Sequence, residues 1–291
     1  MSLFDQLVAQ ALKNQTELAP LRVVVEKELL HHDIIREMSS AGLLRGLTFM
    51  GDSCLRACYG ANRLSEDLDF TGGSHFKREA LSNLADVLID RLERKYGLEV
   101  DVDAPVRDTG NVATWKLKLT TRPEQKDLPA QKISIDICAL PSYDKRPVLM
   151  RNDYGVDMGT AGLIIQAQSR EEILADKLVA LALRPNRIKY RDLWDIVWLK
   201  QHNIDLPLDF IPAKISDHKH TAGKFLDLLK ERKRQLQHQA EVRSDFIKEM
   251  QRFLPPKIKV ETIENEAFWD VLKDIVSTEC QRVIQSLAGT K

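Results

Sequence analysis

Hydrophobic and polar residues recur along the chain with periods that divide it into four blocks. In the first block, apolar residues at helical spacing lead up to Gly42, which predicts amphipathic helices that end there. The second block mixes runs with the period of a strand and runs with the period of a helix. The third and fourth blocks are helical and are separated by a break at Pro207 and Pro212. The blocks are residues 1–42, 43–167, 168–202 and 203–291.

The second block holds the strands that the pattern predicts. Two helices accompany them, and the longer one is expected to end at Gly97. The predicted strands span residues 47–50, 98–102, 112–121 and 132–139, and the predicted helices span residues 54–59 and 75–96. We therefore expect an N-terminal domain at 1–167, with helices and a mixed core, and a helical domain at 168–291.

Two aspartates at alternating positions, Asp67 and Asp69, are the first candidate for chemistry. If residues 63–70 are extended, the period of two places Arg63 and Ser65 on the same face as both aspartates. Neighbouring carboxylates repel each other unless a cation lies between them, and oxygen ligands of this kind suit Mg²⁺. The alternative is that this Asp-x-Asp pair is only a solvated strand edge.

A turn at Gly51 lies just upstream of these aspartates. The turn joins the strand at 47–50 to the helix that follows, so the backbone N–H groups of Gly51, Asp52 and Ser53 form a natural phosphate cradle. A nucleoside triphosphate that carries its metal would fit both features.

The strand at residues 132–139 carries a third acid. Ile133, Ile135 and Ile137 alternate with Ser134 and Asp136, and an acidic residue in the middle of a strand needs a partner or a metal. Asp136 is therefore a candidate third metal ligand. The alternative, that this face is simply solvated, weighs about equally.

A second constellation lies in residues 169–199. Ser169 and Glu172 have the spacing of a capping box, and Lys177 stands beside the apolar stripe of the helix that follows. Such a lysine can reach a phosphate, although it more often extends into solvent. On the next helix, Asp192 is placed to orient Lys177, to pair with an arginine or to act as a base.

Composition and charge describe an ordinary globular chain. The 291 residues are 43% hydrophobic, and 43 basic residues balance 43 acidic ones, so a nucleic-acid partner would need a local basic patch. No apolar run approaches a membrane span, and the N-terminus lacks a basic start, so we expect a cytoplasmic protein without membrane contact. The four cysteines suit a reduced, buried state.

Together the two constellations resemble the AbiEii/AbiGii nucleotidyltransferase toxins. The first pattern is Gly51-Asp-Ser53 followed by Arg63-x-Ser65-x-Asp67-x-Asp69-Phe70. The second is Asp176-Lys177-x-x-Ala180-x-x-x-Arg184 followed by Arg191-Asp192-x-x-Asp195. Each pattern is moderately specific and the combination is strong, and the resemblance covers roughly residues 40–200.

The resemblance implies a fold, an activity and partners. The fold is α+β, with a polymerase-β-like nucleotidyltransferase core built on a mixed sheet, N-terminal helices and a helical C-terminal lobe. The activity is nucleotide transfer from an NTP with Mg²⁺, by the toxin of a bacterial toxin–antitoxin or abortive-infection pair. The acceptor is RNA in several members, notably the 3′ end of tRNA, and protein in others. The implied partner is a cognate antitoxin.

The resemblance also assigns roles to individual residues. Ser65 and Asp67 match the first catalytic positions, Asp69 the second metal carboxylate, Lys177 the nucleotide-binding lysine and Asp192 the late acidic residue. The nucleotide-binding residues would be Gly51, Asp52, Ser53, Arg63 and Ser65, together with Lys177. The metal would be held by Asp67, Asp69 and Asp136.

Two positions depart from the family pattern. Asp52 replaces a second glycine and puts an acid where triphosphate oxygens approach, unless it serves as the N-cap of the helix. Asp136 stands where relatives often have glutamate. Basic residues from Arg184 to Arg191 and from Lys230 to Arg234 are the candidate RNA track, although the second run is more often a solvated helix face.

Other functions leave other signatures. A phosphotransferase or GTP-binding protein would use the same phosphates and metal, but the sequence has no GxxxxGK[ST] motif. A non-catalytic nucleotide-binding module would lack Asp67 and Asp69, and a purely structural helical protein would need neither.

Overall fold

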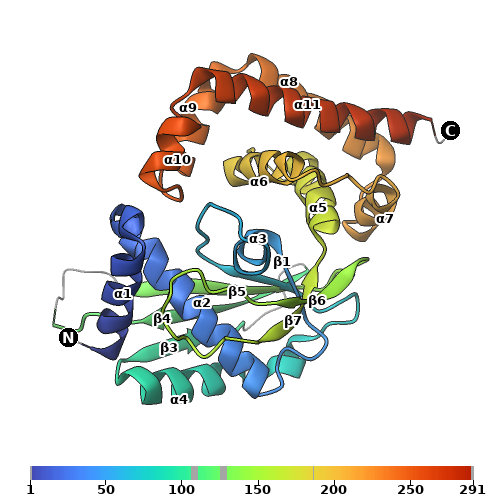
Figure 1. Cartoon of the computed structure of the whole chain (residues 1–291). Coiled ribbons are helices and arrows are strands. Elements are labelled where there is room, and N and C mark those ends of the chain that lie inside the picture. The colour runs from blue at the N-terminus through green and yellow to red at the C-terminus, as the bar shows by residue number, and fades with distance from the viewer. Residues whose placement is uncertain (1, 106–110, 125–129, 186, 290–291) are drawn as a thin grey trace. The chain divides into compact units, whose positions relative to one another are not determined.

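The computed structural model describes residues 2–105, 111–124, 130–185 and 187–289. The chain forms two compact units, Met1–Gln168 and Ser169–Lys291 (Figure 1). The first unit contains the sheet, and the described part of the second is helical.

The first unit is built on a mixed sheet of seven strands within the described residues, in the order β3-β4-β5-β2-β1-β7-β6. Two pairings are parallel, β2 with β5 and β1 with β7, and the others are antiparallel. The predicted α+β class with a mixed sheet is therefore confirmed. The strands are β1 (Thr48–Met50), β2 (Leu68–Thr71), β3 (Val100–Asp103), β4 (Val112–Leu119), β5 (Gln131–Cys138), β6 (Lys145–Leu149) and β7 (Ile164–Gln168).

Helices cover this sheet. Helix α2 packs against β5 and α4, α4 packs against β3, and α3 contacts β1, β2 and β7. The helices and 3₁₀ turns are α1 (Leu3–Asn14), η1 (Thr16–Leu21), α2 (Arg22–Ser40), α3 (Gly51–Tyr59), η2 (Arg78–Leu81) and α4 (Leu84–Tyr96). Helix α4 ends at Gly97, whose φ of 62° is the left-handed conformation that glycine adopts without strain.

Helix α2 buries an unusual number of polar side chains. Among its apolar residues lie the acids Glu26, Glu28 and Asp33 and the consecutive histidines His31 and His32, all of which are buried. Buried groups of this kind persist only where hydrogen bonds or ion pairs satisfy them, so α2 connects polar partners as well as covering the sheet.

The structure corrects three expectations for this unit. The extended segment predicted for residues 63–70 forms a strand only at β2, from Leu68 onward, and the helix predicted from residue 75 begins at Leu84 after the 3₁₀ turn η2. Strands β6 and β7 were not predicted. Strand β6 reads KRPVL, and its mostly exposed positions and its internal Pro147 suit an edge strand without the alternation that signals a strand from sequence.

The second unit is a helical assembly in its described part. Helix α5 packs against α6, α7 and α8, and α11 packs against α6 and α8. The helices are α5 (Arg170–Leu183), α6 (Tyr190–Gln201), α7 (Phe210–Asp217), α8 (Ala222–His238), α9 (Ala240–Met250), α10 (Pro256–Glu261) and α11 (Glu266–Ala288). None of the helices described in either unit combines the length and the apolar character needed to cross a membrane.

Candidate active site

Strand β2 places Asp69 in the middle of the sheet. It pairs with β1 on one side and β5 on the other, so Asp69 stands in register with Met50 across the antiparallel pair and with Asp136 across the parallel pair. Parallel strands in register bring equivalent positions to the same level of the sheet. The structure thus places two of the three predicted metal carboxylates on adjacent strands at one level.

The three carboxylates are half-buried, and two of them, Asp67 and Asp136, accept hydrogen bonds from neutral donors of the sheet. Asp67 comes just before β2, and its Oδ1 accepts a hydrogen bond from the backbone N–H of Ser134 at 2.9 Å. Oδ1 of Asp136 accepts one from the hydroxyl of Thr114 at 2.6 Å. Within the described residues, no three His, Cys, Asp or Glu side chains gather closely enough to hold a metal ion by themselves.

The start of helix α3 lies against Asp69. Gly51 has a φ of 73°, and a methyl group placed on it would lie 2.9 Å from Oδ2 of Asp69, so a side chain at residue 51 would press on this carboxylate. The residue before the helix, Met50, supplies no side-chain cap. The first N–H groups of a helix have no partner within the helix and attract anions, so a phosphate cradle adjoins a candidate metal ligand.

Asp52 and Arg63 form a buried ion pair behind this turn. Their side chains are 7% and 1% exposed, and Oδ2 of Asp52 lies 3.0 Å from a guanidinium nitrogen of Arg63. Asp52 is therefore not the N-cap of α3, a position that Met50 occupies. Asp52 departs from the family pattern, and Arg63, the first residue of the Arg63–Phe70 pattern, neutralises its charge.

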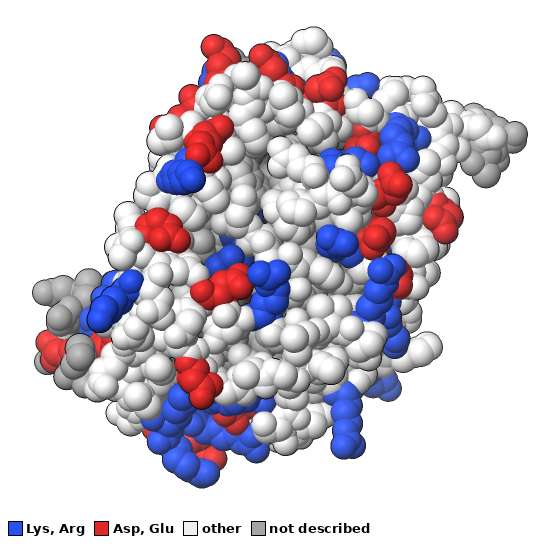
Figure 2. Space-filling view, viewed as in Figure 1, with Lys and Arg blue, Asp and Glu red and all other residues white. Residues whose placement is uncertain are grey.

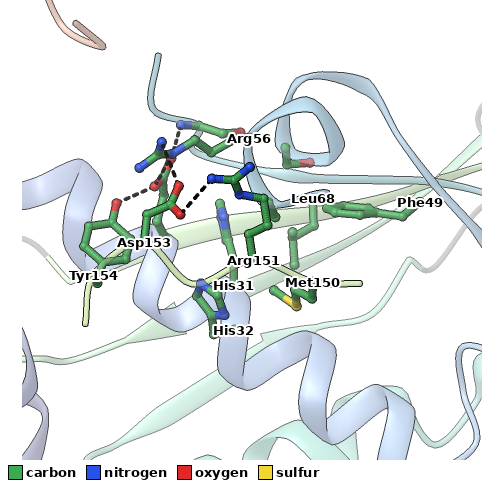
Figure 3. Close-up of a pocket in the computed structure, with 13 residues that line it drawn as sticks. His31, His32, Phe49, Arg56, Leu68, Met150, Arg151, Asp153 and Tyr154 are labelled. Carbon is green, nitrogen blue, oxygen red and sulfur yellow. Dashed lines mark hydrogen bonds and ion pairs between the residues drawn. The ribbon is translucent and has the colours of Figure 1, made fainter. Parts of the chain in front are cut away.

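The two motif serines are buried and line the cavity drawn in Figure 3. The cavity has a volume of about 20 Å³, and His31, His32, Arg56 and Tyr154 are among its other lining residues. Within the described structure the hydroxyl of Ser53 has no hydrogen-bond partner, whereas that of Ser65 donates to the backbone oxygen of Asp67 at 3.4 Å.

Sequence reasoning missed the part of helix α2 that borders this cavity. Burial lowers the pKa of His32 to about 3 and that of His31 below its ordinary value, so both rings are neutral near pH 7. Glu28, on the same helix, accepts a hydrogen bond from the backbone N–H of Ser65. The one available signal was the run of acids and histidines inside an otherwise amphipathic helix.

The second unit holds a buried charge cluster around Lys177. Its ammonium lies 2.8 Å from Oδ1 of Asp192 and 2.8 Å from Oδ2 of Asp195, and Arg184 approaches Asp192 at 3.4 Å. Lys177, Asp192 and Asp195 are each at most 6% exposed, so the alternative of a solvent-extended lysine is wrong.

Electrostatics fixes the protonation state of Asp192 in this cluster. Burial favours the neutral acid, but Lys177, with Lys189 and Arg184, outweighs it and holds the pKa of Asp192 below its ordinary value. Asp192 is therefore a carboxylate near pH 7, and of the roles predicted for it the structure supports orienting Lys177 and pairing with Arg184.

Ser169 caps helix α5 as predicted, by accepting a hydrogen bond from the N–H of Glu172 at 3.0 Å. The Glu172 side chain pairs with Lys214 of α7 at 2.9 Å.

The basic residues proposed for an RNA track have partners within their own unit. Arg191 pairs with Glu249 at 3.2 Å and lies over the ring of Phe253, while Arg232 donates to the backbone oxygen of Arg184. On the face drawn in Figure 2, basic and acidic residues are interspersed. The densest group of basic side chains on that face lies along its lower edge, and the RNA track stays a prediction.

Comparisons with known proteins bear on this arrangement. A family model described as nucleotidyl transferase AbiEii toxin, type IV TA system, matches residues 33–274, which is most of the chain. Among curated proteins, none matches the sequence.

The solved structure of a nucleotidyltransferase toxin shares the fold. MenT4, a nucleotidyltransferase toxin from Mycobacterium tuberculosis H37Rv, superposes with a TM-score of 0.63 at 17% identity, over 97% of this chain and 89% of that chain. JHP933 from Helicobacter pylori gives a TM-score of 0.48 at 18% identity, over 91% of this chain and 95% of that chain.

Proposed function

Because this chain belongs to the AbiEii family of nucleotidyltransferase toxins of type IV toxin–antitoxin systems, we propose that it transfers a nucleotide from an NTP to the 3′ end of a tRNA. We further propose that Asp67 and Asp69 hold the Mg²⁺ for this transfer. The family makes the chain an enzyme and implies a cognate antitoxin. The acceptor, the metal and the residue roles are proposals.

The observation that carries the site assignment is the contact between Gly51 and Asp69. The cradle for the triphosphate must adjoin the metal ligands, because a Mg²⁺ ion held by Asp67 and Asp69 would also offset the charge of the phosphates. Here the first residue of α3 lies directly against the Asp69 carboxylate, with no space for a side chain between them. Gly51 thus lets the helix N-terminus and the metal ligand approach the same phosphate.

The donor set fits Mg²⁺. Asp67 and Asp69 provide carboxylate oxygens, and Mg²⁺ is typically bound by one or two carboxylates together with substrate phosphates and water. Two protein carboxylates are therefore sufficient, even though no cluster of three is present among the described residues. When bound, the ion would offset phosphate charge and lower the pKa of the attacking hydroxyl.

The other residues of the site would bind the phosphates, supply a further ligand or base, and neutralise Asp52. The N–H groups of Gly51, Asp52 and Ser53 hold phosphate oxygens through the helix N-terminus. Asp136, in register with Asp69, serves as a further ligand or as the base for the acceptor hydroxyl. The buried Asp52–Arg63 pair keeps the negative charge of Asp52 from opposing the triphosphate.

Lys177 and Asp192 have a separate assignment, carried over from the family pattern. We propose that Lys177 binds the nucleotide and that Asp192 and Asp195 set the direction of its ammonium group. The two ion pairs at 2.8 Å support the second part of this assignment.

The test is a transfer assay with Mg²⁺, each labelled NTP in turn and total cellular RNA. The wild type is expected to label tRNA, and Asp67→Asn is expected to lower the rate by about 100- to 1000-fold because the carboxylate charge is lost at unchanged size. Asp101→Asn is the matched control, since Asp101 is an exposed strand aspartate of the same unit that pairs with Lys118.

The outcomes separate the alternatives. Label on tRNA that survives Asp67→Asn would overturn the metal assignment. Label on protein but not on RNA would replace the tRNA acceptor with a protein target, and no label from any NTP would favour a non-catalytic nucleotide-binding module. Growth of cells that express the toxin gives a second measure, since arrest should require Asp67.

A further inference from the structure

The segment between Leu64 and Asp67 carries the motif but lies outside the sheet. It is neither helix nor strand, and β2 begins only at Leu68. A segment without ladder hydrogen bonds needs other partners for its backbone groups, and those partners decide where its side chains lie. Here two partners for backbone groups and one partner for a side chain come from one stretch of helix α2.

Lys27, Glu28 and His31 hold this segment from one side. Oε1 of Glu28 accepts a hydrogen bond from the backbone N–H of Ser65 at 2.7 Å, and Nε2 of His31 lies 3.1 Å from the backbone oxygen of Glu66. Lys27 pairs with the Glu66 side chain at 3.0 Å. The three α2 residues lie within about one helical turn, so they bind the loop as one surface.

Glu28 is also the centre of a buried network. Its Oε2 accepts hydrogen bonds from Nε of Arg56, at 3.0 Å, and from the hydroxyl of Tyr154. Arg56 in turn donates to the backbone oxygen of Ala61 at 3.0 Å. One carboxylate therefore connects α2, α3, the motif segment and the β6–β7 connection, beside the cavity of Figure 3.

Arg56 and Tyr154 keep their protons near neutral pH. Burial opposes the charge on Arg56, but Glu28 and Tyr154 outweigh it and raise the pKa of Arg56 above its ordinary value. Burial, reinforced by Glu28, raises the pKa of the Tyr154 hydroxyl, which stays protonated and able to donate.

From these contacts we propose that Glu28 is a positioning residue for nucleotidyl transfer, which fixes the Ser65 backbone and thereby the carboxylate of Asp67. Asp67 is held on its other side by the N–H of Ser134, so the Glu28 contact and the β5 contact fix it from two directions. The inference rests on the proposed function of Asp67. Glu28 precedes the matched range 33–274, so this chain supplies the contact from outside the part that the family model describes.

The chain offers a matched control on the same helix. Glu26 is also fully buried, and it accepts hydrogen bonds from Arg22, Arg122 and Gln131, none of which belongs to the motif. Glu26→Ala should therefore destabilise the fold as Glu28→Ala does, without moving Asp67.

The experiment compares Glu28→Ala, Glu28→Gln and Glu26→Ala with the wild type, after the folded fraction of each has been measured by circular dichroism. For Glu28→Ala, kcat per folded molecule should fall about 10- to 100-fold, as for other residues that orient metal ligands. The Mg²⁺ concentration for half-maximal rate should rise by a similar factor. Glu28→Gln keeps an oxygen to accept from Ser65 and should recover most of this loss.

A binding measurement makes the result independent of turnover. Mn²⁺ affinity, measured by electron paramagnetic resonance with a non-hydrolysable NTP analogue, should weaken about tenfold in Glu28→Ala and stay unchanged in Glu26→Ala. Equal Mn²⁺ affinity in the two variants would overturn the positioning role, and so would a Glu28→Gln variant no better than Glu28→Ala. Absence of any transfer by the wild type would overturn the proposed function, while the Mn²⁺ affinities would still decide the role of Glu28.

Discussion

The two charged clusters of this protein treat their carboxylates in opposite ways. In the first unit, Asp67 and Asp136 are half-buried and accept hydrogen bonds from neutral donors, a backbone N–H and a hydroxyl. In the second unit, Asp192 and Asp195 are almost fully buried and share the ammonium of Lys177.

The difference separates two uses of acidic residues that look alike in sequence. Neutral donors orient a carboxylate without cancelling its charge, so the contact with Ser134 leaves the charge of Asp67 to attract a cation. A lysine between two aspartates cancels charge inside the cluster, and removing one partner of such a buried group is costly. The first arrangement suits a ligand, and the second fixes the direction of one lysine.

The largest loss in the free energy of unfolding should come from Lys177→Met, which breaks the cluster of the second unit. The change leaves Asp192 and Asp195 buried without their shared cation, which costs about 3–5 kcal/mol for buried pairs of this kind. Lys248→Met, which removes an exposed pair with Asp245, is the control and should cost about 1 kcal/mol or less. Urea unfolding followed by tryptophan fluorescence measures both. Equal losses would show that the buried cluster does not stabilise its unit.

The next largest effect should be the loss of stability in acid, which begins at a higher pH for His32 of the first unit than for Asp192 of the second. Burial lowers the pKa of His32 in the folded state to about 3, against 6.5 in the unfolded chain. Below about pH 6.5 the unfolded state therefore binds a proton that the folded state does not, and stability falls by about 1.4 kcal/mol per pH unit. Unfolding free energies between pH 7 and pH 4 should fall at least this steeply, because the pKa of His31 is lowered as well, and His32→Gln should reduce the slope by about 1.4 kcal/mol per pH unit.

Asp192 should affect the free energy of unfolding only at lower pH. Its folded-state pKa lies below the ordinary value of 3.8, so its stabilising contribution is complete above that pH and is lost as the pH falls below it. Asp192→Asn should therefore change the slope only below about pH 4. A slope change for Asp192→Asn near pH 6 would contradict this assignment.

The smallest of these effects on stability should come from Gly51→Ala. A residue with a side chain costs about 1–2 kcal/mol in the left-handed conformation that Gly51 adopts, and the added methyl would lie 2.9 Å from Oδ2 of Asp69. Transfer should fall about 10- to 100-fold because Asp69 is displaced. Gly97→Ala, at another left-handed glycine with open space around it, is the control and should match the stability loss while keeping full transfer.

Elements that depend on local pattern were predictable from sequence. Ile133, Ile135 and Ile137 are buried and Asp136 is not, as the alternation at 132–139 indicated. The end of α4 at Gly97 and the cap at Ser169 also follow from short-range chemistry, because both features are satisfied within a few residues.

What the sequence did not reveal depends on distant partners. The extended segment predicted from residue 63 failed because its backbone bonds go to Glu28 and His31 of α2 instead of to a neighbouring strand. The register of Asp69 with Asp136 arises from strand pairing, which no local pattern encodes. The burial of Lys177 depends on a helix that begins at Tyr190, after the proline that ends α5.

The parallel pairing of β2 with β5 also determines when the proposed site can form during synthesis. Asp67 and its donor Ser134 are 67 residues apart, so the acidic edge exists only after β5 has been synthesised and has joined β2. Non-local pairings of this kind form slowly, because a long loop must close before any contact rewards it. A growing chain on the ribosome therefore carries the motif before Asp67 has its Ser134 donor, and in that interval the proposed metal site is incomplete.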